Sequence, residues 1–155
     1  MKKLLGLFFI MMLLVSGTVL TTSEPDAMHT MEGTWELQNF HNWDGEVVTT
    51  AELSEGYRQV KMYYNGKVMW SRTASTDTKD ADGNNVIGRF GFGTYKITDT
   101  ELIETIEYGD QGMMRDLETL RIFTFQLKLT DSTYSQITLD EEGNPTFSEN
   151  YNRID

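Results

Sequence analysis

Residues 60–73 read VKMYYNGKVMWSRT, and this stretch decides the fold class. Two runs rich in strand-forming residues, 60–64 and 67–73, flank the dipeptide Asn65-Gly66. Asn and Gly tolerate the positive φ angles that both central positions of a type I′ turn require. The stretch therefore predicts a β-hairpin with a two-residue turn.

The rest of the chain continues in the same way, as strand-like runs separated by short turn clusters. These further runs are 33–40, 86–97, 101–108, 117–129, 133–139 and 147–154. Only 50–55 resembles a helical turn. Consecutive antiparallel strands close most economically into a barrel, because closure removes exposed sheet edges. The sequence thus predicts an all-β fold, a single up-and-down antiparallel β-barrel of about eight strands. A β-sandwich with longer crossovers is the alternative.

The composition is acidic and lacks cysteine. The 155 residues include 13 Lys and Arg against 24 Asp and Glu, a net charge of −11, and the length suits one domain. Without a cationic cluster, a nucleic-acid partner is not expected. The absence of cysteine excludes disulfides, thiolate metal sites, a Cys nucleophile and a lipid-modified Cys anchor.

The N-terminal segment has the features of an export signal. Lys2 and Lys3 precede the uncharged run 4–20, LLGLFFIMMLLVSGTVL. A short basic start followed by an apolar region is typical of a secretory signal peptide, and a retained membrane anchor is the alternative. The predicted organisation is a signal peptide over 1–22, a flexible leader over 23–30 and the barrel domain over 31–155. The mature protein would be periplasmic or secreted, with no membrane insertion after cleavage.

Export predicts the N-terminus of the mature protein. Protein purified from its native host should begin between about residues 18 and 25, because cleavage follows the apolar region. N-terminal sequencing or intact-mass measurement checks this, and a protein that still begins at Met1 would contradict it.

Alternation along each strand divides residues between the two faces of the sheet. Phe123 and Phe125 share a face with two leucines, so this face should point inward. The same rule predicts three further inward sets: Leu102, Ile106 and Tyr108 with Glu104; Val60, Met62 and Tyr64 with Arg58; Tyr95 and Ile97 with Arg89, Gly91 and Gly93. The two glycines indicate a bulge or a close approach of backbone, and ligand clearance is the other explanation.

Several arginines also occupy predicted inward positions, namely Arg58, Arg89, Arg121 and, if its strand faces the same way, Arg72. A guanidinium matches a carboxylate, so the interior is predicted to hold an anionic head group beside the hydroxyl of Tyr95 or Tyr108. The alternative is an internal Glu–Arg–Tyr network around Glu104 that fixes strand register. The full set of candidate ligand-binding residues is Arg58, Met62, Trp70, Arg89, Tyr95, Glu104, Tyr108, Arg121 and Phe125.

Metal-site patterns are incomplete. His29 lies in the predicted flexible leader and His41 follows the first predicted strand, so a site with both histidines is not expected. Residues 77–85, DTKDADGNN, resemble part of a calcium loop through Asp80 and Asp82, but Arg89 occupies the position of the bidentate Glu. A solvated hairpin loop is therefore predicted there, with no metal and no cofactor.

The two ends of the predicted barrel carry a family resemblance. Gly33-Thr34-Trp35 opens the first strand, and Arg153 lies near the end of the chain. This resembles the lipocalins, in which a Trp near the start packs beneath an Arg from the last strand. The chain as a whole resembles a bacterial lipocalin-like domain family of exported proteins, through EGTWEL (32–37), NGKVMW (65–70), GTYKITDTELIETIEY (93–108), FTFQLKL (123–129) and ENYNRI (149–154). The resemblance implies a calycin-type barrel, a small apolar ligand and structural roles for Trp35 and Arg153. The cysteine pair of many secreted lipocalins is absent.

These observations lead to one functional hypothesis and two alternatives. The hypothesis is an exported lipocalin-like protein that binds a small hydrophobic or amphipathic molecule in its barrel and is not an enzyme. The first alternative is a barrel enzyme that uses Glu104 with Tyr95 or Tyr108 as acid and base. The second is an envelope protein that binds other proteins and has a filled core. The oligomeric state is left open.

Overall fold

The computed structural model describes residues 31–73, 77–79 and 83–155. The predicted signal peptide and leader lie outside these ranges, as do Asp80 and Asp82 of the calcium-like loop.

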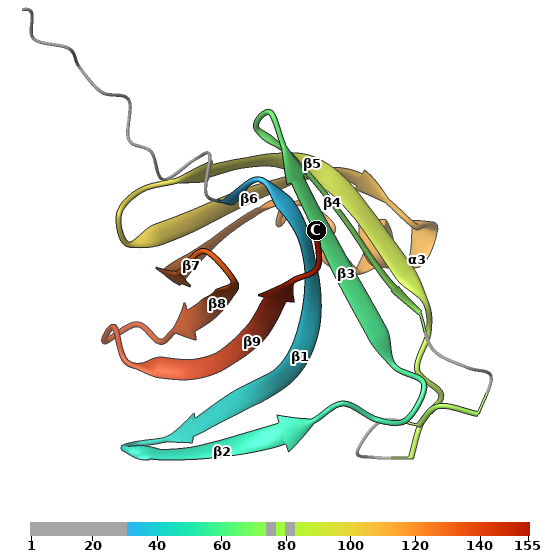
Figure 1. Cartoon of the computed structure of the whole chain (residues 1–155). Coiled ribbons are helices and arrows are strands. Elements are labelled where there is room, and N and C mark those ends of the chain that lie inside the picture. Colours follow the sequence, from blue (N-terminus) through green and yellow to red (C-terminus); the bar gives the residue numbers. More distant parts are fainter. Residues whose placement is uncertain (1–30, 74–76, 80–82) are drawn as a thin grey trace, which may run out of the picture.

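The chain forms nine strands and one short helix in the described ranges (Figure 1). In order they are β1 (Gly33–Asp44), β2 (Val47–Glu52), β3 (Arg58–Tyr64), β4 (Lys67–Thr73), β5 (Arg89–Ile97), β6 (Glu101–Gly109), α3 (Gln111–Leu117), β7 (Ile122–Leu129), β8 (Thr133–Leu139) and β9 (Pro145–Arg153).

Eight of the strands close into a ring. β3 to β9 follow one another as antiparallel neighbours, and β1 pairs with both β3 and β9. The first half of β1 contacts β3, whereas its far half pairs with β2, which extends outward beside it (Figure 1). This confirms the predicted up-and-down antiparallel barrel. From β3 to β9, each strand pairs with the strand that comes next in the sequence, so the longer crossovers of a sandwich are excluded.

Two local predictions were wrong. Residues 50–55 were expected to form a helical turn, but Val47–Glu52 is strand β2, whose β-branched residues suit pairing with β1. The run 117–129 was expected to be one strand, but β7 begins only at Ile122. Helix α3 precedes it, and the Asp110 side chain caps its N-terminus by accepting from the Met113 backbone N–H at 2.9 Å.

The Asn65-Gly66 hairpin is confirmed. Both residues have positive φ, 47° and 70°, and the flanking strands pair in register from Tyr64↔Lys67 to Arg58↔Thr73. The turn chemistry therefore fixes the register of β3 against β4.

Gly91 and Gly93 of β5 allow neighbouring atoms to approach the backbone closely. A Cβ at Gly91 would stand 2.6 Å from the Trp70 indole nitrogen, and one at Gly93 would collide with the carbonyl oxygen of Thr105. The pairing of β5 with β6 also shifts register between Phe92 and Gly93. A bulge with close backbone approach, rather than ligand clearance, explains the Gly93 position.

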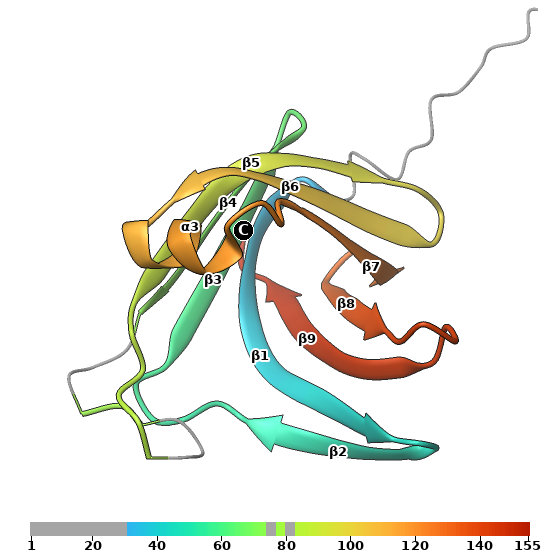
Figure 2. The ribbon, with the colours of Figure 1, turned by 180° about the vertical axis from the view of Figure 1, so that it is seen from behind.

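The two ends of the barrel differ. One end, which we call the Trp35 end, holds the start of β1 and the end of β9, and it is filled by large buried side chains. They include Trp35, Tyr63, Val68, Tyr95, Leu102 and Tyr134. The opposite end, the helix end, carries α3 next to β5 and β6 (Figure 2). One cavity, lined by Met113 and Leu117 of α3, lies toward the helix end.

Candidate functional site

The inward face of β3 is the opposite of the predicted one. Gln59, Lys61 and Tyr63 are only 4, 3 and 1% exposed. Met62 is 47% exposed, and Arg58 forms an outer ion pair with a glutamate of β1. The prediction for this strand was therefore wrong, and polar side chains occupy the barrel interior.

A buried ion pair forms the centre of this interior. The Lys61 ammonium lies 3.0 Å from each carboxylate oxygen of Glu104 and 2.8 Å from the amide oxygen of Gln136. The Tyr63 hydroxyl donates to Glu104 and lies 3.3 Å from the Tyr134 hydroxyl. Because Lys61 and Glu104 are each 3% exposed, the two charges must compensate each other.

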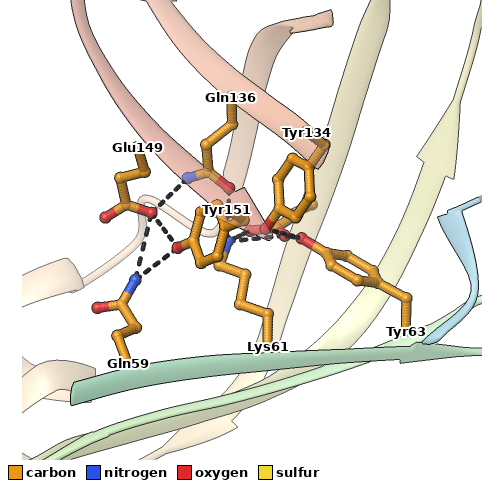
Figure 3. A network of polar contacts seen from close by, with 8 residues as sticks. Gln59, Lys61, Tyr63, Tyr134, Gln136, Glu149 and Tyr151 are labelled. Atoms are coloured by element: carbon orange, nitrogen blue, oxygen red, sulfur yellow. Dashed lines mark hydrogen bonds and ion pairs between the residues drawn. The ribbon is translucent and has the colours of Figure 1, made fainter. Parts of the chain in front are cut away.

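A second carboxylate completes the network (Figure 3). One oxygen of Glu149, Oε2, accepts from the Tyr151 hydroxyl at 2.5 Å, from Gln136 at 2.9 Å and from Gln59 at 3.3 Å. The Gln136 amide joins both carboxylates, since its oxygen accepts from Lys61 and its nitrogen donates to Glu149. We call these residues the interior network: Gln59, Lys61, Tyr63, Glu104, Tyr134, Gln136, Glu149 and Tyr151.

The tyrosines of the network hold their protons tightly. Burial, and then the Glu104 carboxylate, raise the pKa of Tyr63 and of Tyr134 well above 10. Burial and Glu149 do the same to the pKa of Tyr151, and burial raises the pKa of Tyr95 to about 12. A phenolate would need an uncompensated negative charge inside the barrel.

Stability should fall steeply above pH 10. The folded state retains protons that the unfolded tyrosines lose near pH 10, so their stabilisation is complete below that pH and is lost as the pH rises toward the folded values. Each buried tyrosine should lower the folding equilibrium constant by up to about tenfold per pH unit. Urea unfolding at several alkaline pH values, followed beside tyrosinate absorbance, checks this. Tyr63→Phe should lessen the slope, and a flat profile would contradict the expectation.

A cavity of ≈ 260 Å³ lies between the interior network and α3. One part of its wall is apolar, from Trp70, Ile106, Met113, Leu117 and Phe123, and the other is polar, from Gln59, Lys61, Arg72, Arg89, Gln136 and Glu149. Its volume falls just below the range of about 300–1,000 Å³ usual for ligand pockets. The cavity therefore suits a compact amphipathic molecule better than a long lipid.

Helix α3 covers this cavity. The buried Met113 side chain packs where Gly91 and Gly109 leave room for its methyl group. Arg89 Nη2 lies 2.7 Å from Asp116 and ties the helix to β5. The ion pair is partly exposed, so packing by Met113 contributes more to the position of the helix than charge does.

The structure places the nine predicted ligand-binding residues in five different surroundings. Trp70 and Arg89 line the cavity. Glu104 belongs to the interior network, while Tyr95 and Phe125 pack deeper in the core. The other four residues were predicted to point inward and do not line the cavity. Arg58, Met62 and Tyr108 are exposed, and Arg121 donates to the carbonyl oxygen of Met114 in α3 at 3.4 Å.

Sequence reasoning missed most polar cavity residues, namely Gln59, Lys61, Gln136 and Glu149. A usable signal was present, because three strands place a polar residue two positions from a tyrosine on the same face. These pairs are Lys61 with Tyr63, Gln136 with Tyr134, and Glu149 with Tyr151. A tyrosine hydroxyl buried at such spacing needs polar partners.

At the Trp35 end, Arg153 lies over the Trp35 ring with its guanidinium carbon 4.1 Å from the ring centroid. The indole nitrogen donates to the Met31 carbonyl oxygen at 2.9 Å, and Arg153 donates to the carbonyl oxygens of Glu32 and Asp131. This contact joins the first and last strands of the barrel.

Residues 31–73, 77–79 and 83–155 contain no group of three or more His, Cys, Asp or Glu side chains that could hold a metal ion. None of the helices in the same ranges is long and apolar enough to cross a membrane.

No protein-family model matches the chain, and no curated protein matches it. Solved structures similar to it include a lipocalin-like protein from Bacteroides uniformis ATCC 8492, with 15% identity, a TM-score of 0.47 and coverage of 81% of this chain and 99% of that one. An uncharacterized protein from Bacteroides eggerthii DSM 20697 has 17% identity and a TM-score of 0.46, covering 79% and 98%. Lobster apocrustacyanin A1 has 13% identity and a TM-score of 0.42, covering 81% and 62%.

Proposed function

We propose that this protein is exported and binds a small amphipathic molecule in the cavity beneath α3, without transforming it. The observation that carries the proposal is the divided wall of the cavity, with aromatic and aliphatic side chains on one part and amide and charged groups on the other. Such a combination is typical of ligand sites, where apolar area supplies affinity and few polar groups set orientation.

The same arrangement favours binding over catalysis. Both oxygens of Glu104 already accept from Lys61, and Glu104 does not line the cavity. A general acid or base must reach its substrate directly or through one water molecule. Of the two tyrosines expected to act with Glu104, Tyr95 lies in the core and Tyr108 is exposed on the outer face.

Filling the cavity should abolish binding of a small amphipathic probe. With 3-phenylpropan-1-ol as the probe, the wild type should give saturable shifts of the Trp70 indole signal in NMR titration. Ile106→Trp, or Leu117→Trp from the opposite wall, should weaken this binding about tenfold or more because the added ring takes the space.

Met69→Trp on the outer face of β4 is the matched control and should bind like the wild type, since Met69 is 48% exposed. Thermal unfolding of each variant shows that it is folded. Unchanged affinity in both filled variants, or no saturable binding by the wild type, would contradict the proposal.

A further inference from the structure

The charges that line the cavity do not all cancel within the protein. Among the described residues, four charged side chains line it: Lys61, Arg72, Arg89 and Glu149. Lys61 is paired with Glu104, and Arg89 with Asp116. One cation, Arg72, and one anion, Glu149, are left without an oppositely charged partner in the described ranges.

The buried guanidinium of Arg72 lacks one of its hydrogen-bond partners among the described residues. Its side chain comes from the inner face of β4, and its Nε–H is buried without a hydrogen-bond partner in the described part of the chain. The Tyr57 hydroxyl, a neutral group, lies near its guanidinium. A buried guanidinium N–H without a partner is costly, so this position favours an acceptor supplied from the cavity.

Glu149 faces the cavity with one oxygen still open. Tyr151, Gln136 and Gln59 all donate to its Oε2, and the described residues supply no donor to Oε1. Arg72 and Glu149 both line this cavity, and no ion pair joins them among the described residues.

From this juxtaposition we infer that the cavity binds a compact zwitterion with an apolar side group, such as an apolar α-amino acid. Its anionic group would lie at Arg72, its ammonium at Glu149 Oε1, and its side group against Trp70, Ile106 and Phe123. A molecule with only one of the charges would satisfy one protein charge and bring a like charge near the other. The inference rests on the proposed binding function and deepens it.

Four probes of similar size separate the possibilities by calorimetric or NMR titration: L-phenylalanine, 3-phenylpropanoate, 2-phenylethylamine and the neutral 3-phenylpropan-1-ol. L-Phenylalanine should bind about tenfold or more tightly than either singly charged probe, because it alone satisfies both groups. Glu149→Gln keeps an acceptor for Tyr151, Gln136 and Gln59, and it should remove the advantage over 3-phenylpropanoate. Arg72→Met should remove the advantage over 2-phenylethylamine.

Arg58→Met, on the outer face, is the control and should leave all four affinities unchanged. If the neutral alcohol binds in the cavity and L-phenylalanine binds no better than the singly charged probes, the zwitterion is overturned while the binding function stands. If Glu149→Gln and Arg72→Met both bind L-phenylalanine like the wild type, the zwitterion is likewise overturned. If no probe binds, the alcohol included, both proposals are overturned.

Discussion

Lys61→Met is expected to destabilise the barrel by about 3–5 kcal/mol, because it leaves the Glu104 carboxylate buried without its charge partner. The ammonium of Lys61 donates to both oxygens of Glu104 and to Gln136, and neither member of the pair is more than 3% exposed. Since domains of this size are stable by about 5–15 kcal/mol in all, the loss is a large part of the total. Urea unfolding at neutral pH measures it.

The double variant Lys61→Met/Glu104→Met should recover most of that loss, because replacing both charges by apolar side chains removes the desolvation cost of each. Lys67→Met is the matched control. Its ion pair with Glu107 is about half exposed on both sides and should contribute about 1 kcal/mol or less. Equal effects of Lys61→Met and Lys67→Met would show that the interior pair does not compensate buried charge.

Trp35→Ala should cost a similar amount, about 3–5 kcal/mol, because Trp35 is fully buried and its removal leaves a cavity at the closed end. Arg153→Ala should cost less, since a cation over an indole ring stabilises by about 0.5–2 kcal/mol. The two changes should be strongly non-additive, because each removes the same contact between the first and last strands.

A double-mutant cycle measured by chemical unfolding determines the coupling. Trp43→Ala is a control of equal size change at the far end of β1, where Trp43 is only partly buried, and it should cost clearly less. If the Trp35→Ala/Arg153→Ala loss equals the sum of the single losses, the ring and the guanidinium do not stabilise each other.

The sequence by itself determined the barrel and its turns. Asn65-Gly66 specifies a two-residue turn through backbone conformation alone, and such local chemistry can be recognised without knowledge of distant residues. The contact between Trp35 and Arg153 was also predicted, because the two residues resemble the lipocalin pattern of a Trp near the start of the barrel beneath an Arg from its last strand.

Only the tertiary structure decided which face of β3 points inward. Alternation shows that Gln59, Lys61 and Tyr63 share a face, yet it does not show which face is inside when both faces carry aromatic residues. The apolar content of Met62 and Tyr64 favoured the wrong choice. Helix α3 was also missed, because its seven residues are too few for a helical period to be evident.

The interior network has the same non-local origin. Burying Lys61 is favourable only because β6 brings Glu104 and β8 brings Gln136 to its ammonium, from 43 and 75 positions along the chain. The cost of desolvating a charge is a property of the residue, whereas its compensation is a property of the assembled barrel. Local pattern therefore predicted the strands, and only the closed ring determined which polar groups line the cavity.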